Sequence, residues 1–434
     1  MIGSPFLTAV DEARLNIRGS RDPLGLVPLW GKLGRRVVGN LTTATTSVRS
    51  FTAMLLGYYF AEEFVPAGRD AEALRLGAFL KFEQLTGYAR WHVNGDGNLR
   101  GINEVRRRLA EQGTIRIAAD SSGQILSNQK TYGLWGLYTM PSRASGLIAQ
   151  DALCLTPLAR EFVESHVLRV LRKAKPDAEK RIGEILRREH TDIEPDGKDS
   201  GLLSALAKAL APAVSDADRE FYRSYLVLGK AGSCEWQETF ATMVEEHLPA
   251  ADDFCLKHLG ELIKQARRRG NSQLAEHLQS IRELEALLVP LADLFGYLQS
   301  RDGAKVSAVT GELRDTWGKG LTHVEPKAIT ELSGAIGEVY GDALAATRFA
   351  DLASAFRAGD FHSAVSLCLA HNEFVMRSRG GASPWVIVSD GRLDVRFRDE
   401  GLDGLSPAKT LAAVWRNGFY LDPLKLIADE LRAA

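Results

Sequence analysis

The chain has 434 residues, of which 45% are hydrophobic and 25% charged, a composition typical of soluble globular proteins. This length predicts two to four domains rather than one core. The most apolar segment, residues 51–60, is shorter than the about 20 residues that a membrane-spanning helix needs, which argues against a membrane protein. Charged residues near the N-terminus interrupt any secretory signal, so we expect a cytoplasmic protein.

The formal net charge of −1 conceals an uneven distribution of charge. Residues 14–49 carry seven Lys or Arg against one Asp, and residues 100–175 carry twelve Lys or Arg against six Asp or Glu. Both segments therefore have a net charge of +6, and the rest of the chain is acidic. Positive charge concentrated in this way can attract a polyanion although the overall pI is not basic.

Cysteine spacing gives no sign of a disulfide framework or of a metal site. The four cysteines are far apart and form no C-x-x-C pair: Cys154, Cys234, Cys255 and Cys368. We expect them to be reduced thiols in the core, as in cytoplasmic proteins.

Residues 1–98 are expected to form an N-terminal arm followed by a basic helical region. Turn-forming Pro and Gly residues favour an irregular arm over residues 1–30. A short helix is predicted at 29–38, and longer helices are predicted at 46–64 and 69–86, where apolar residues recur at helical spacing.

A run rich in threonine, residues 40–47, lies beside Arg35, Arg36 and Arg49 in this region. Hydroxyl groups, the backbone amides at a helix N-terminus and nearby arginines are the groups that bind a phosphate backbone. The alternative is an ordinary loop in which one threonine caps the next helix and the arginines are solvated.

The segment 99–163 has a distinctive order of short elements. A helix is predicted at 102–110, Gly113 ends it, and a hairpin is predicted from 114–118 and 124–126. An aromatic and Gly-rich region, residues 132–148, is expected to hold the next helix.

After this region come Gly146-Leu147-Ile148, a few variable residues, and then Leu155-Thr156-Pro157 at the start of another helix. This pattern resembles winged-helix modules of the helix-turn-helix class, in which a strand ends at the Leu-Thr pair and the proline opens the final helix. The resemblance implies either DNA binding or a protein-interaction module, because winged helices serve both purposes. The aromatic insertion at 132–138 departs from the winged-helix pattern.

If the resemblance holds, a recognition-type helix at 141–149 places Ser142 and Arg143 in a groove of the nucleic acid. Arg106 and Arg107 of the first helix are then expected to contact the backbone. Three consecutive arginines, 106–108, cannot all point to one side of a helix.

The module and its following helices are expected to span residues 99–190. Residues 191–200 are polar and charged, contain Pro and Gly, and lack periodic apolar positions, which predicts a linker between domains. Residues 201–378 read as an all-α helical bundle.

Within the bundle, apolar residues at alternating spacings of three and four positions form a seam over residues 281–298. The seam is interpreted as internal core, with an intermolecular coiled coil as the alternative. Pro290 interrupts the pattern, so we expect two helices or one kinked helix.

Residues 379–434 are expected to form a small β-hairpin and terminal helices packed on the bundle. The hairpin is predicted to turn at Ser389-Asp390-Gly391-Arg392, and helices are predicted at about 407–415 and 422–431. The fold class is therefore mainly α, with a winged-helix-like part before an all-α domain and a small C-terminal hairpin.

A polar cluster precedes the hairpin and contains His371, Asn372, Glu373, Arg377 and Arg379. It is interpreted as a network that braces the hairpin. The alternatives are contact with a nucleic acid or nucleotide, since arginine binds phosphate with a planar fork, or a catalytic centre.

No phosphate-binding loop, dinucleotide-binding motif, nucleophile elbow or metal-protease motif occurs, and the nine histidines are scattered. The sequence therefore predicts no cofactor, no metal and no catalytic residues.

The function that these observations favour is a non-catalytic nucleic-acid-binding subunit, with DNA as the expected ligand, in a larger bacterial complex with protein partners, such as an antiviral defence or repair system. The interface is expected to comprise Arg35, Arg36, Arg49, Arg106, Arg107, Ser142 and Arg143. One alternative is a protein adaptor that uses the winged helix and the bundle. The other is a nuclease or nucleotide-processing enzyme centred on His371–Arg379.

Overall fold

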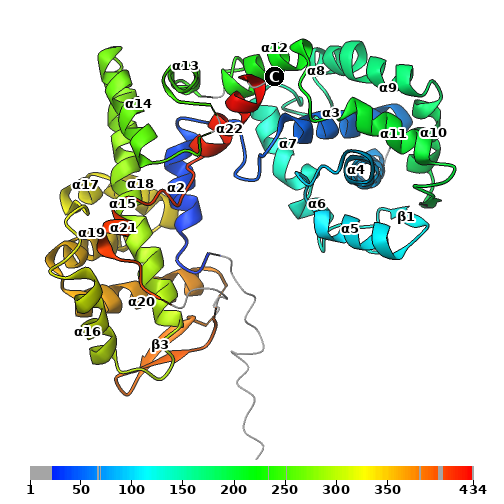
Figure 1. Cartoon of the computed structure of the whole chain (residues 1–434). Coiled ribbons are helices and arrows are strands. Elements are labelled where there is room, and N and C mark those ends of the chain that lie inside the picture. Colours follow the sequence, from blue (N-terminus) through cyan, green and yellow to red (C-terminus); the bar gives the residue numbers. More distant parts are fainter. Residues whose placement is uncertain are drawn as a thin grey trace, which may run out of the picture. The chain divides into compact units, whose positions relative to one another are not determined.

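The computed structural model of the chain describes residues 22–65, 68, 70–232, 234–250, 252–380, 383–398 and 404–432. The fold is mainly α, as predicted, and the described residues form two small antiparallel sheets of two strands each (Figure 1). The chain divides into two compact units. Unit 1 combines the described residues before Arg35 with Phe254–Phe419, and unit 2 combines Arg35–Asp253 with the described residues from Tyr420 onward.

Unit 2 contains the following elements in chain order: α3 (Val48–Phe64), α4 (Ala71–Asn94), α5 (Ile102–Glu111), β1 (Ile115–Ala118), α6 (Gln129–Tyr132), α7 (Leu134–Ala144), α8 (Pro157–Phe162), the π-helical turn η1 (Val163–Val167), α9 (Leu168–Ala174), α10 (Ala178–Arg187), β2 (His190–Ile193), α11 (Ser200–Ala209), α12 (Asp216–Tyr222), the π-helical turn η2 (Arg223–Val227), α13 (Gln237–His247) and α22 (Leu421–Arg432).

The core of unit 2 is organised around α3, of which every residue from Val48 to Ala61 is buried. Helix α4 packs directly on α3 and also contacts α11, α5 and β1 (Figure 1). The two helices approach closely because α3 has a glycine at the contact. A Cβ atom on Gly57 would lie 2.7 Å from the ring of Phe79. The most apolar stretch of the sequence is therefore a helix buried on all sides.

The sequence predicted that β1 pairs with residues 124–126. In the structure β1 pairs with β2 instead, in the register Ile115↔Ile193 and Ile117↔Thr191. The segment that leads into the expected partner strand is held by a side chain instead. The guanidinium of Arg108 donates to the carbonyls of residues 122, 123 and 124 at 2.9–3.1 Å. These bonds hold the segment in a turn.

The predicted linker at 191–200 is not a boundary between the two units. Its first residues belong to β2, and Asp199 is 1% exposed and accepts hydrogen bonds from Arg181 and from the amide of Glu194. The polar side chains that suggested a linker are used to close this turn. The contacts place the passage between the units at Asp253–Phe254 instead.

Unit 1 contains these elements: α2 (Leu26–Arg35), whose last residue is assigned to unit 2, α14 (Leu256–Arg268), α15 (Ser272–Gln299), α16 (Val306–Trp317), α17 (Pro326–Glu331), α18 (Ser333–Tyr340), α19 (Ala343–Ala358), α20 (Phe361–Ser378), β3 (Val386–Ser389), β4 (Arg392–Val395) and α21 (Ala408–Leu411).

Helix α15 is the central helix of unit 1 and runs without a break through Pro290. The sequence predicted two helices or a kinked one at this point. The seam residues of α15 are buried within the single chain, which confirms the interpretation of the seam as internal core; Leu284 and Leu291, for example, have no exposed surface. Polar residues of the same helix hold loops. Buried Glu285, for example, accepts the backbone amides of Arg416 and Asn417.

The C-terminal hairpin forms as predicted, with Ser389 opposite Arg392. Its two turn residues, Asp390 and Gly391, both have positive φ angles, of 49° and 71°, as a tight hairpin turn requires. The helix expected at 407–415 is shorter, since α21 ends at Leu411. Ser406 does not cap it but bonds to Asp293 of α15.

We predict that replacing either seam leucine, by Leu284→Ala or Leu291→Ala, lowers the free energy of unfolding by about 2–5 kcal/mol, because each leaves a cavity in a closed core. Thermal or denaturant unfolding measures the loss. Leu344→Ala is the control, since this side chain is 65% exposed. Unchanged stability of both seam variants would contradict the assignment of the seam to the core.

Glu83 of α4 is a buried carboxyl group. Within the described part of the chain, its hydrogen-bond partners are all neutral groups. It accepts the amide of Leu134 at 2.7 Å and the side-chain amide of Gln129 at 2.9 Å. Burial raises its pKa from 4.5 to about 7. The folded state therefore retains a proton that the unfolded chain releases, and the stabilisation from this proton is lost as the pH rises from about 4.5 to about 7.

We predict that Glu83→Gln, which cannot ionise, gains stability relative to the wild type as the pH is raised through this interval. The relative gain is about 3 kcal/mol for a pKa shift of this size. Melting temperatures of both proteins at pH 4.5, 6 and 8 give the comparison. Parallel pH profiles would show that Glu83 does not titrate in this range.

Candidate nucleic-acid interface

Arg49, predicted to contact phosphate, is instead a buried structural residue. It lies in the first turn of α3, is 4% exposed and donates to Asp218 at 3.1 Å and to the carbonyl of Ala213 at 2.5 Å. Burial acts to raise the pKa of Asp218, but the hydrogen bond and charge of Arg49 outweigh it, so the pKa lies below its ordinary value. The Arg49 charge is thus neutralised inside unit 2.

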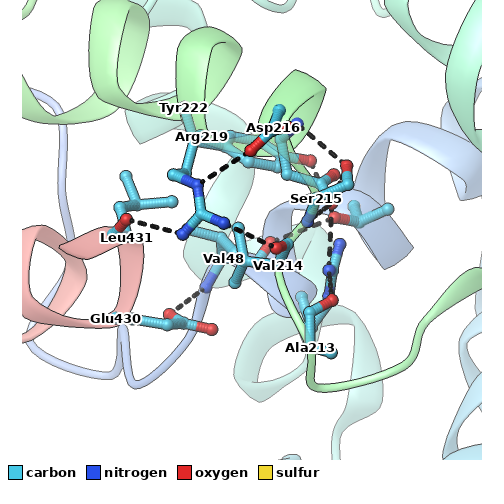
Figure 2. A network of polar contacts seen from close by, with 12 residues as sticks. Val48, Ala213, Val214, Ser215, Asp216, Arg219, Tyr222, Glu430 and Leu431 are labelled. Carbon is cyan, nitrogen blue, oxygen red and sulfur yellow. Dashed lines mark hydrogen bonds and ion pairs between the residues drawn. The ribbon is translucent and has the colours of Figure 1, made fainter. Parts of the chain in front are cut away.

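Part of the hydroxyl run also serves the fold. Ser47 caps α3 and donates to Glu430 at 2.6 Å, and the same carboxylate accepts the amide of Val48 at 2.9 Å. Figure 2 shows Glu430 at the amide of Val48, and beside it Arg219 reaching Asp216 and the carbonyl of Leu431. The N-terminus of α3 is therefore closed by α12 and α22 and is not open to a phosphate.

The three consecutive arginines of α5 have three different environments. Arg107 is exposed but paired with Glu104 and Glu111, and Arg108 is buried and paired with Glu104. Hydrogen bonds from Arg107 are the largest cause that lowers the pKa of Glu104 to about 2. Arg106 is exposed and stacks on Trp91, with its guanidinium carbon 3.9 Å from the ring centroid.

Of the two residues expected in a groove, only Arg143 is accessible. Ser142 has no exposed surface and donates to the sulfur of Met54 at 3.0 Å, because the helix begins earlier than predicted, at Leu134, and Pro141 lies within it. Arg143 is half-buried and donates to the carbonyl of Ala149 at 3.2 Å.

Arg35 and Arg36 are both exposed at the end of α2. Arg35 is held against unit 2, since it donates to the carbonyls of Gly39 and Leu41 and lies 4.1 Å from the ring centroid of Tyr420. In the described part of the chain, no ion pair engages the side chain of Arg36.

The loop between η2 and α13 brings two of the predicted arginines into one neighbourhood. The Cys234 thiol donates to the carbonyl of Arg36. On the other side, a Cβ atom on Gly146 would lie 3.0 Å from the Cβ of Ala231, and the amide of Gly146 donates to the carbonyl of Arg143. The backbone of Arg36 is therefore bonded to this loop, and Arg143 lies three residues before the glycine that packs against it.

This loop adds a cation that sequence reasoning missed, Lys230, which is exposed. Its only signal in the sequence was a lysine in a short Gly-rich turn, Gly229-Lys230-Ala231-Gly232. We call Arg36, Arg143 and Lys230 the loop cluster. Within the described residues, no carboxylate forms an ion pair with any of the three, although the exposed Glu235 follows the loop.

The polar cluster before the hairpin binds backbone groups of unit 1. His371 bonds the carbonyl of Leu24 at 2.8 Å, and Asn372 donates to the carbonyl of Pro23 at 2.9 Å while its own oxygen accepts the amide of Trp385 at 2.9 Å. Both side chains have no exposed surface. Burial lowers the pKa of His371 to about 4, which keeps the ring neutral at neutral pH.

The arginines of this cluster have separate partners. Arg379 donates to the carbonyl of Asp22 at 2.5 Å, and Arg377 pairs with Glu373 on the exposed face of α20. The geometry agrees with the bracing interpretation of this cluster, which holds the segment before α2 and the start of the hairpin.

The described residues contain no group of three or more His, Cys, Asp or Glu side chains placed to hold a metal ion. All four cysteines are free thiols, of which Cys368 is buried and the others are half-buried. None of the described helices is both long enough and apolar enough to cross a bilayer.

We predict that Arg49→Met destabilises the protein by about 3–5 kcal/mol, because it leaves Asp218 without its cation in a buried site. Arg36→Met, in which the same residue type is changed at an exposed position, is the control and should leave the free energy of unfolding unchanged within about 0.5 kcal/mol. Equal melting temperatures for the two variants would contradict the structural role of Arg49.

Comparison of the chain with protein-family models, with curated proteins and with solved structures found no match to any of them.

Proposed function

We propose that the protein is a non-catalytic nucleic-acid-binding subunit and that unit 2 binds the phosphate backbone through the loop cluster. The observation that carries this proposal is the convergence of Arg36 and Arg143 on the loop that holds Lys230. These cations come from three separate parts of the chain, and no ion pair within the described part of the chain neutralises them.

Some exposed cations of unit 2 are already ion-paired, unlike the cations of the loop cluster. Arg172 and Arg223 pair with glutamates, and so does Lys198. Accessible cations that form no ion pair are suited to neutralise phosphates and so release counterions from a polyanion. The proposed set of phosphate-contacting residues therefore leaves out the buried Arg49 and Ser142 of the expected interface and adds Lys230.

The winged-helix resemblance of residues 99–163 belongs to this proposal. Helix α5, strand β1, helix α7 and helix α8 follow one another in the expected order, without the strand expected at 124–126, and Thr156 caps α8 with Pro157 in its first turn. Ile148 and Leu155, from the two short segments that carry the resemblance, form one isolated antiparallel bridge. DNA is the expected ligand, and a larger bacterial assembly, such as a defence or repair system, is the expected context.

The second candidate function is a protein adaptor, because winged helices also serve as protein-interaction modules.

The test is titration of fluorescently labelled duplex DNA, single-stranded DNA and RNA at two salt concentrations. We predict that the triple variant Arg36→Gln, Arg143→Gln and Lys230→Gln binds at least about tenfold more weakly, and that the slope of log K against log salt falls by about 2–3, one for each lost phosphate contact.

A matched control removes two arginines and one lysine that are ion-paired in the same unit, by Arg172→Gln, Arg223→Gln and Lys198→Gln. It changes the net charge equally, so it should retain most of the affinity. Equal losses in the two triple variants would remove the loop cluster as the site. Absence of binding to every probe at low salt would overturn the function and leave the adaptor as the better candidate.

A further inference from the structure

The corner where α4 meets α5 presents a cation stacked on an aromatic ring. Arg106 lies flat over Trp91, with 3.9 Å between the guanidinium carbon and the ring centroid. Arg106 is exposed and Trp91 is half-buried. No carboxylate among the described residues forms an ion pair with Arg106, although its neighbours Arg107 and Arg108 are both paired.

Nearby acidic groups are already neutralised. Asp96, in the loop between α4 and α5, is paired at 2.7 Å with Arg90, whose side chain is 3% exposed and also donates to the carbonyl of Asn98. Glu104 is occupied by the two other arginines of α5. The charge of Arg106 therefore faces solvent without a competing carboxylate.

The same loop joins this stack to a second aromatic residue. A Cβ atom on Gly97 would lie 3.3 Å from a terminal nitrogen of Arg106, so the loop passes directly beside the guanidinium. Three residues later Arg100, which is exposed, donates to the carbonyl of Tyr132 at 3.4 Å. Tyr132 is 44% exposed. The loop thus runs from the Arg106–Trp91 stack to Arg100, which contacts the backbone of Tyr132.

This combination favours unpaired bases over a duplex. A guanidinium plane with one face on a tryptophan offers its other face to a base, and aromatic rings stack on bases of any sequence. In a duplex these base faces are covered by neighbouring base pairs, so a stacking site has no access to them. The positive charge of Arg100 and Arg106 suits the adjoining phosphates.

We propose that the α4–α5 corner, comprising Trp91, Arg100, Arg106 and Tyr132, binds single-stranded nucleic acid by stacking unpaired bases on Arg106 and the aromatic rings. This inference rests on the proposed function and specifies its ligand, since it makes unpaired strands the preferred form of nucleic acid.

The experiment is a fluorescence-anisotropy titration of the full chain with labelled oligothymidylate and oligouridylate of about 16 nucleotides and with a duplex of equal length. The informative substitution is Arg106→Lys, which keeps the charge and removes the planar stacking group. We expect Arg106→Lys to weaken binding of both single strands about tenfold, as much as Arg106→Gln does. Arg106→Lys should leave duplex binding unchanged.

Arg107→Lys is the matched control, because it alters the adjacent arginine, which is paired with Glu104 and Glu111. It should bind like the wild type. Trp91→Leu should lose single-strand affinity and Trp91→Phe should keep most of it, and melting temperatures confirm that each variant is folded.

Single-strand affinity that survives Arg106→Lys but falls in Arg106→Gln would reduce the site to a point charge and overturn the stacking inference alone. Equal loss of duplex and single-strand binding would do the same. A wild-type protein that binds none of the probes at low salt would overturn the proposed function, and with it this inference.

Discussion

Unit 2 depends on the complete burial of helix α3. A helix enclosed on all sides must have its polar groups satisfied by neighbouring chain, because an unpaired charge in such a site is strongly destabilising. The first turn of α3 carries Arg49, and Asp218 of α12 and the carbonyl of Ala213 supply its partners. Glu430 of α22 supplies the acceptor for the helix N-terminus. Segments distant in sequence are thereby joined around one helix end.

Unit 1 shows the same principle at irregular stretches of backbone. Backbone carbonyls before α2 have no helix or sheet to pair with, and such groups need acceptable partners when buried. His371 and Asn372 provide them from α20, and Glu285 of α15 does the same for amides near residue 416. Residues that look functional in the sequence are therefore used to fasten irregular backbone.

The division between structural and available cations follows from these contacts. Arg49 and Arg108 are buried and bonded within unit 2. The other group is accessible to solvent and forms no ion pair within the described residues: Arg36, Arg106, Arg143 and Lys230. The expected interface drew on both groups, since the residue type alone does not distinguish them. The cations of both proposed sites are the second group together with the exposed Arg100, and each site is organised by a loop that contains glycine.

The sequence by itself determined the fold class, the positions of most helices, the C-terminal hairpin and the start of α8 at Pro157. These features depend on local spacing, on capping residues and on turn chemistry, all of which act over a few residues. The tertiary structure alone decided the pairing of β1 with β2, the place of the boundary between units, and whether each arginine is buried and paired or accessible to solvent. Such features depend on which distant carbonyl or carboxylate group the fold places within hydrogen-bond distance of a side chain, and local sequence patterns contain no information about these distant partners.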